Sequence, residues 1–190
     1  MKKDKPFLAD IKELRRRARQ HIEDGAVTEG YQGNLETILK LLNESLATEI
    51  ICVLRYKRHY FMAQGIHAEL VSKEFLQHAN EEQVHADQIA ARIAQLGGEP
   101  DFNPQGLASR SHSEYKEGNS LLDMVKEDLV AERIAIDSYS GMIRYIGDRD
   151  STTRRMFEGI LEDEEEHADD LAKILSALDP CPAGRQAAKK

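Results

Sequence analysis

The strongest constraint on the fold is a set of four long apolar stripes, each interrupted near its middle by a glutamate. Within each stripe the apolar residues recur at spacings of three and four, which is typical of the buried face of an α-helix. The expected helices span residues 35–64, 69–96, 121–146 and 151–178. The interrupting glutamates are Glu49, Glu82, Glu132 and Glu164. Four helices of similar length, each with one buried face, predict an all-α four-helix bundle.

The lengths of the connections predict how the helices are joined. Gly65 separates the first pair, and the short turn at Gly147 separates the second pair, so each pair should be antiparallel. Residues 99–119 are polar, contain two prolines and should hold at most a short helical turn. About twenty residues can span the roughly 40 Å length of such a helix. We therefore expect two up-down pairs joined by one long crossover.

The two ends of the chain lie outside this bundle. A short helix is expected over residues 7–23, and a glycine-containing linker follows it. We divide the chain into an N-terminal helix and linker (1–33), the bundle (34–178) and a tail (179–190). Residues 1–19 hold eight Lys or Arg against three Asp or Glu. We interpret this basic helix as a solvated face or a contact between subunits.

Charge and composition exclude several classes of function. The net charge is −8, which argues against a dedicated nucleic-acid binder and suits a protein that attracts cations. No apolar run approaches the roughly 18 residues of a membrane span, and no apolar run follows the basic N-terminus. The two cysteines, Cys52 and Cys181, form no disulfide framework. We expect a cytoplasmic protein with no membrane partner.

The buried glutamates need a compensating charge. An unpaired carboxylate in a protein core costs several kcal/mol. No Lys or Arg belongs to the stripes near the four glutamates. Divalent metal is therefore the expected counter-charge.

Two ExxH motifs complete the proposed ligand set. His85 follows Glu82, and His167 follows Glu164, by three residues, so each pair shares one helix face. Four carboxylates and two imidazoles suit two Fe(II) ions, with Mn or Zn as substitutes. We expect Glu82 and Glu164 to bridge the ions. The terminal ligands would be His85 with Glu49 on one ion and His167 with Glu132 on the other.

The two halves of the bundle repeat each other. Glu49 and Glu132 precede the glutamate of the next ExxH motif by 33 and 32 residues, and each precedes a tyrosine by seven. Those tyrosines are Tyr56 and Tyr139. The repeat indicates an internal pseudo-twofold, as a symmetric two-metal site would need.

From about residue 35 to residue 178 the chain resembles the bacterioferritin and ferritin superfamily. The motifs that carry the resemblance are ATEI, EEQVHAD, DLVAER and LEDEEEHADDL. The resemblance implies a ferritin-like fold and a ferroxidase centre that binds two Fe ions per subunit and oxidises Fe(II) with O2 or H2O2. It also implies that Tyr56 lies beside the metals, where it would donate an electron or orient a ligand.

Departures from the family pattern refine these expectations. Bacterioferritins carry a haem-ligating Met where this chain has Gln83, so we expect no haem. The dozen residues after the last helix are too few for the fifth helix of 24-subunit shells, and an N-terminal helix is present instead. This is similar to the Dps-like branch, and we expect a homo-oligomeric shell of twelve subunits rather than 24. The ligand set lies within one bundle, so the site should be internal to each subunit.

Two other functions fit parts of the pattern. A rubrerythrin-like di-metal peroxidase would share the ligands, but rubrerythrins usually carry a second iron domain built on four cysteines. A DNA-protecting shell would use the basic helix. We favour the ferroxidase over both, and we do not expect DNA to be a partner.

The remaining candidate residues have plainer interpretations. We expect His78 to be a hydrogen-bonded core histidine, Tyr139 to serve packing and Cys52 to be a small core residue. Surface positions are expected for the other histidines, His21, His59, His67 and His112.

Overall fold

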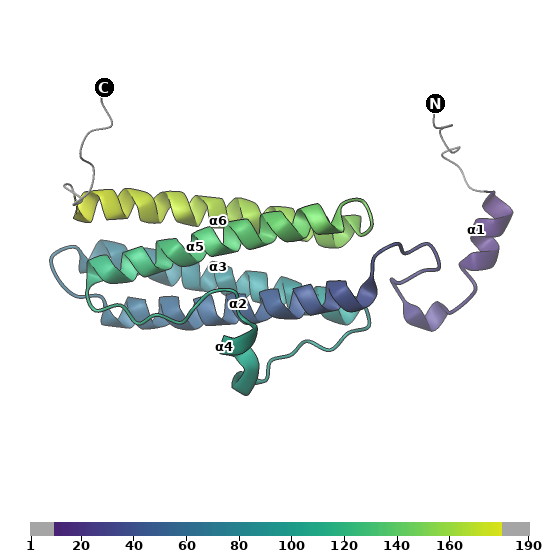
Figure 1. The fold of residues 1–190 in the computed structure, drawn as a ribbon, viewed down its shortest axis with the longest axis horizontal. Helices are drawn as coiled ribbons and strands as arrows, with labels where there is room; N and C mark the ends of the chain where they lie inside the picture. The colour runs from purple at the N-terminus through teal and green to yellow at the C-terminus, as the bar shows by residue number, and fades with distance from the viewer. Residues whose placement is uncertain (1–9, 180–190) are drawn as a thin grey trace, which may run out of the picture.

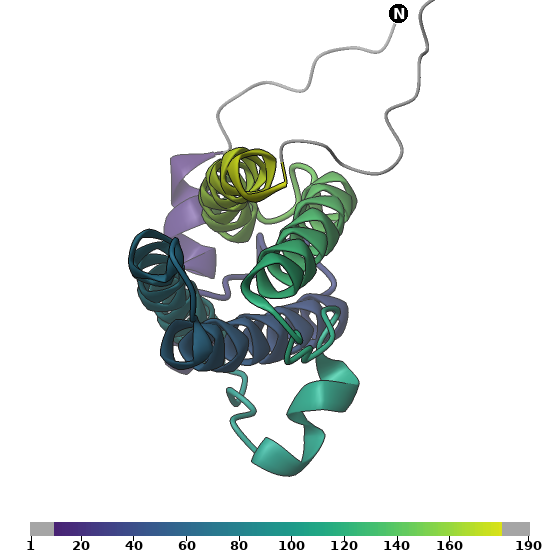
Figure 2. The ribbon, with the colours of Figure 1, turned by 90° about the vertical axis from the view of Figure 1, so that its left-hand side faces the viewer.

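The computed structural model describes residues 10–179, and every regular element within that range is helical. Four long helices lie side by side: α2 (Leu35–Met62), α3 (Ala68–Gln95), α5 (Leu121–Ile146) and α6 (Ser151–Leu178) (Figure 1). Viewed end-on, α2 pairs with α3 and α5 with α6, while α2 also faces α5 and α3 faces α6 (Figure 2). The prediction of an all-α four-helix bundle is confirmed, with helix ends within two residues of those expected.

Local signals fix where the helices begin and turn. Asn34, Ser120 and Asp150 cap α2, α5 and α6 by accepting hydrogen bonds from backbone N–H groups three residues further on. Gly147 ends α5 with a φ of 52°, a conformation that glycine adopts without strain. These caps explain why the predicted ends of the long helices are accurate.

Two apolar layers fill the bundle on either side of its middle. One layer lies toward the start of α2 and is represented by Leu42, Ile89 and Phe157. The other lies toward the end of α2 and is represented by Phe75 and Val125. All five side chains are fully buried. The layers flank a polar level in the middle of the bundle, where the predicted ligands lie.

The crossover between α3 and α5 runs along α2 and contains η2 (Pro104–Gly106) and α4 (Leu107–Arg110) (Figure 1). Side chains of α2 hold it in place. Asn43 donates to the carbonyl of Glu99 at 3.3 Å, and the Thr48 hydroxyl accepts from the backbone N–H of His112 at 2.9 Å. The expected long crossover with a short helical turn is confirmed, and it covers one side of α2.

The N-terminal segment lies beyond one end of the bundle (Figure 1). It contains α1 (Ile11–Arg17) and η1 (Ile22–Asp24), so the helix predicted over 7–23 is shorter than expected within the described residues. Between α1 and η1, His21 adopts a left-handed backbone conformation with φ of 48°, which a continuous right-handed helix over residues 7–23 could not contain. Ile11 and Ile22 are 59% and 75% exposed, so no face of the bundle covers this segment.

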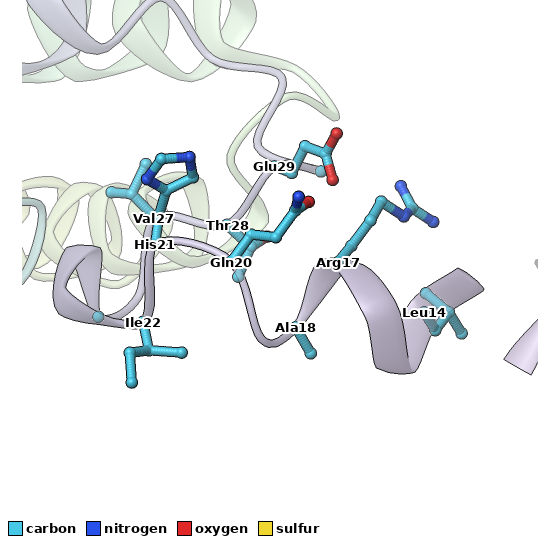
Figure 3. A pocket seen from close by; sticks show the side chains of 11 residues that line it. Leu14, Arg17, Ala18, Gln20, His21, Ile22, Val27, Thr28 and Glu29 are labelled. Carbon is cyan, nitrogen blue, oxygen red and sulfur yellow. The ribbon is translucent and has the colours of Figure 1, made fainter. Parts of the chain in front are cut away.

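A cavity of about 220 Å³ lies within this N-terminal segment (Figure 3). All of its lining comes from residues 14–30, including Leu14, Arg17 and Val27. None of the predicted metal ligands lines it, so it is separate from the polar level of the bundle. Within residues 10–179 no helix has the length and apolar character needed to cross a membrane.

Candidate metal centre

All six predicted ligands meet in the middle of the bundle. Each is at most 3% exposed. Four of them offer donor atoms that all lie within 4.8 Å of one another, namely Glu49, Glu82, His85 and Glu164. A second group with the same spacing contains Glu82, Glu132, Glu164 and His167. Glu82 and Glu164 belong to both groups, which is the arrangement expected of two bridging carboxylates.

The two histidines face these carboxylates in the same way. Nδ1 of His85 lies 3.4 Å from Oε2 of Glu49 and 3.5 Å from an oxygen of each of Glu82 and Glu164. Nδ1 of His167 lies 3.6 Å from Glu164 and 3.8 Å from Glu82. Donor atoms bound at about 2.1 Å to one ion are roughly 3 Å apart, so a small contraction would bring each group onto a metal.

The donor atoms themselves indicate that a cation belongs here. Eight buried nitrogen and oxygen atoms of these six residues have no hydrogen-bond partner. They are Oε2 of Glu49, both carboxylate oxygens of Glu82 and of Glu164, Oε2 of Glu132, and Nδ1 of His85 and of His167. Buried polar atoms are almost always paired, and an unpaired one costs free energy. Eight unpaired acceptor-type atoms around one centre fit a pair of divalent ions.

Two further acids orient the histidines from outside. Nε2 of His85 lies 3.0 Å from Oδ2 of Asp163, and Nε2 of His167 lies 2.9 Å from Oε2 of Glu81. Each carboxylate holds the outer nitrogen as a donor, which leaves Nδ1 free to bind metal. These residues were not predicted from the sequence, although each directly precedes the glutamate of an ExxH motif.

Two buried tyrosines contact the centre crosswise. The Tyr56 hydroxyl donates to Glu132, and the Tyr139 hydroxyl donates to Glu49. Each tyrosine thus contacts the lone glutamate of the other half. Tyr139 is buried in the core, as expected of a packing residue, and its hydroxyl makes the equivalent contact to that of Tyr56. A chemical role for Tyr56 stays a prediction.

Burial and mutual contact change the pKa values of the ligand side chains. Burial raises the pKa of Glu82, of Glu132 and of Glu164, and the neighbouring carboxylates raise the pKa values further. Burial opposes the charged form of His85, but the carboxylates of Glu164, Glu49 and Glu82 beside its ring raise its pKa. The Glu49 carboxyl is also desolvated, yet its contacts with Glu82 and His85 lower its pKa. The centre therefore holds protons that arriving cations must displace.

His78 lies directly beside the centre. Its ring stacks on that of His167 with centroids 4.0 Å apart, and its Nδ1 lies 3.2 Å from the Tyr56 oxygen. Burial, with His167 beside it, lowers the pKa of His78 to about 3. The structure thus places His78 as the hydrogen-bonded core histidine that the sequence predicted.

A second buried charged cluster lies on α2 and α5, with its Asp128 one turn before Glu132. Asp128 accepts from Nε of Arg55 at 2.7 Å through Oδ1, and its Oδ2 lies 2.8 Å from Nδ1 of His59. All three residues have 0% exposure. The expected surface position of His59 is wrong, because the crossover covers it and places the carbonyls of Lys116 and Glu117 3.1 Å from its Nε2.

Arg55 is a buried basic residue that the pattern of apolar stripes in the sequence did not predict. It pairs with Asp128 and donates to the Glu114 carbonyl at 3.2 Å, so it does not neutralise the four glutamates. Cys52 is 3% exposed, as expected of a small core residue, with its sulfur 3.6 Å from Nη2 of Arg55. The second cysteine, Cys181, lies outside the described residues.

Comparison with known proteins gives concordant matches. Residues 39–180 match the family model of the ferritin-like domain. Bacterioferritin of Mycobacterium avium is 32% identical over 149 residues, which cover 78% of this chain and 89% of that protein. A nutrient stress-induced DNA-binding protein of Nostoc is 32% identical over 140 residues, or 71% of this chain and 75% of that protein. A dodecameric thioferritin of Bacteroides fragilis, a bacterioferritin-related protein, superposes with a TM-score of 0.76 at 27% identity, covering 78% of this chain and 90% of that chain.

Proposed function

Because the chain belongs to the ferritin family, we propose that its six buried ligands form a di-iron ferroxidase centre within each subunit. The observation that carries the proposal is the set of eight unpaired donor atoms around the middle of the bundle. Glu82 and Glu164 would bridge the two ions. The terminal ligands would be His85 with Glu49 on one ion and His167 with Glu132 on the other.

The reaction would oxidise two Fe(II) ions as substrate, each losing one electron. Hydrogen peroxide takes both electrons and two protons to give two waters, while dioxygen takes them to give hydrogen peroxide. The four carboxylates would offset the charge of the ions. Tyr56 and Tyr139 would orient Glu132 and Glu49. Mn or Zn would bind the same donors without following the same redox course.

We further propose that the chain assembles as a hollow shell of twelve subunits that stores or detoxifies iron. The dodecameric thioferritin of Bacteroides fragilis supports this number. Twelve chains of 21.5 kDa give a particle of about 260 kDa, and 24 chains give about 520 kDa. Light scattering coupled to size exclusion decides between them, and a mass of only one or two chains would contradict the shell.

No haem would bind at the position where bacterioferritins use Met. Gln83 stands there, and its side-chain amide donates to Asp87 at 3.0 Å on the exposed side of α3. A haem absorption band in protein purified from haem-supplemented cells would contradict this.

The ferroxidase proposal is tested by loading the protein with Fe(II) without oxygen and then adding O2 or H2O2. The informative variant is Glu164→Gln, and the matched control is Glu165→Gln, the next residue, which is exposed. We expect wild type and control to bind two ions per chain and to oxidise them. Glu164→Gln should bind fewer and oxidise them at least about tenfold more slowly. Equal rates for Glu164→Gln and wild type would contradict the proposal.

A further inference from the structure

A cavity of about 170 Å³ opens between α3 and α6, beside the metal centre. Its lining consists of four acids, two histidines and one glutamine, and one of the acids, Asp170, accepts a hydrogen bond from Lys173 at 2.8 Å. His167, a proposed ligand, lies on its wall, so the cavity borders the centre. An acidic recess of this kind raises the local concentration of cations.

A third group of potential ligands includes two residues that line this cavity, His78 and Asp170, together with Glu74, which is not part of its lining. Donor atoms of Glu74, His78 and Asp170 all lie within 4.8 Å of one another. Glu74 and His78 are one turn apart on α3, with Nε2 of His78 3.3 Å from Oε1 of Glu74. Asp170 comes from α6. His78 is 1% exposed, while the two acids are half-buried and accessible to an incoming ion.

The hydrogen bonds of His78 leave its Nε2 without a partner of the right kind. The Tyr56 hydroxyl proton is donated to Glu132, so the Tyr56 oxygen can only accept from Nδ1 of His78. A neutral imidazole that donates through Nδ1 carries a lone pair on Nε2. That lone pair faces the Glu74 carboxylate, and two acceptors at 3.3 Å repel each other. A cation between them would turn this repulsion into two bonds.

The other half of the bundle lacks such a group, although the two halves otherwise repeat. His78 lies four residues before Glu82, and the equivalent position before Glu164 is Ile160, a buried apolar residue. The position equivalent to Glu74 is Met156. The two halves therefore differ here: side chains that can bind a metal are present on only one side of the centre, the side on which the acidic cavity lies.

We propose that Glu74, His78 and Asp170 form a third divalent-metal site, which passes ions through the cavity to the dinuclear centre. His78 lies between this site and the centre, because it also forms a group with Glu132 and His167 whose ligand atoms lie within 4.8 Å of one another. The delivery role rests on the proposed ferroxidase function, whereas the binding site stands without it. The ligand class is a first-row divalent cation that accepts mixed nitrogen and oxygen donors.

Binding is tested with Co2+ alone, by calorimetric stoichiometry and by anomalous diffraction from Co2+-soaked crystals. The informative variant is Glu74→Gln with Asp170→Asn. The matched control is Glu69→Gln with Asp169→Asn, which removes two exposed carboxylates from the same helices. We expect three ions per chain in wild type and control and two in the variant. The anomalous peak beside His78 should disappear in the variant while the two central peaks remain.

The possible failures are distinguishable. Two ions in wild type and no peak beside His78 would overturn the third site and leave the dinuclear centre standing. Fewer than two ions in wild type would instead contradict the centre itself. For delivery, Fe(II) oxidation in the variant should be about tenfold slower at low iron and normal at saturating iron. An unchanged rate at low iron would overturn the delivery role.

Discussion

Two fully buried charged clusters lie near each other in the bundle, with Asp128 of one cluster a single turn before Glu132 of the other, and they differ in how their charges are compensated. In the first cluster, Arg55, His59 and Asp128, every side-chain nitrogen and oxygen has a partner within the chain. In the second, the metal centre, eight donor atoms have none. Burial is equal in the two, so burial alone does not mark a binding site. The difference is whether the chain supplies its own counter-charge.

The self-paired cluster has a structural role. Arg55 and His59 each contact carbonyl groups of the crossover as well as Asp128, so they fasten the long connection to α2. In the metal centre the neighbouring carboxylates raise one another's pKa, so without cations their charged forms repel one another. We therefore expect substitutions in the two clusters to change stability in opposite directions.

The largest effect is expected for Asp128→Asn. The change leaves Arg55 buried without a full counter-charge, which typically costs about 3–5 kcal/mol. Denaturant unfolding of the metal-free protein at fixed concentration measures it. Asp137→Asn, at an exposed position of the same helix, should stay within about 0.5 kcal/mol of wild type. Equal stabilities of the two variants would show that the cluster is not what holds the crossover.

Divalent cations should supply the positive counter-charge that the metal centre lacks. Zn2+ is redox-inert, and at 100 times its dissociation constant it should raise the free energy of unfolding by about 2.7 kcal/mol per site. Thermal unfolding with and without Zn2+ measures the change. The Glu164→Gln variant should gain clearly less than wild type, whereas Asp128→Asn should gain as much. If Zn2+ stabilised Glu164→Gln as much as wild type, the stabilising ions would be bound at a site other than the metal centre.

In the metal-free protein, Glu82→Gln should raise the free energy of unfolding. Burial raises the pKa of Glu82 above its unfolded value, so the folded state loses stability as the pH rises through that unfolded value toward 7. Wild type should therefore be less stable at pH 7 than at pH 5. The amide does not titrate, so the variant should gain about 2 kcal/mol at pH 7 and show a shallower pH dependence.

Denaturant unfolding at the two pH values measures this gain, with Glu165→Gln as the exposed control. A loss of stability in Glu82→Gln at pH 7 would mean that the glutamate is already compensated within the chain. The two buried clusters would then no longer differ in how their charges are compensated.

The same contrast explains how much could be predicted from sequence. The four long helices and the six clustered ligands follow from the spacing of residues along single helices, which local patterns record. Arg55 and His59 escape such patterns because a crossover distant in sequence buries them. Glu81 and Asp163 act across helices, and their surface-like positions conceal their contacts with the ligand histidines. His21, between α1 and η1, has a left-handed backbone conformation that the periodicity of apolar residues does not predict.

A smaller effect is expected in a third polar cluster, which joins the N-terminal linker to the bundle. The Tyr31 hydroxyl donates to Asp150 at 2.9 Å, and Arg92 and Thr153 also donate to that carboxylate. Because these partners remain, Tyr31→Phe should cost only about 1 kcal/mol in unfolding experiments. Tyr145→Phe, at an exposed position of α5, should cost less still. If Tyr31→Phe lowered the free energy of unfolding as much as Asp128→Asn, the remaining partners of Asp150 would not be enough. The contact of the linker would then determine the stability at this end of the bundle.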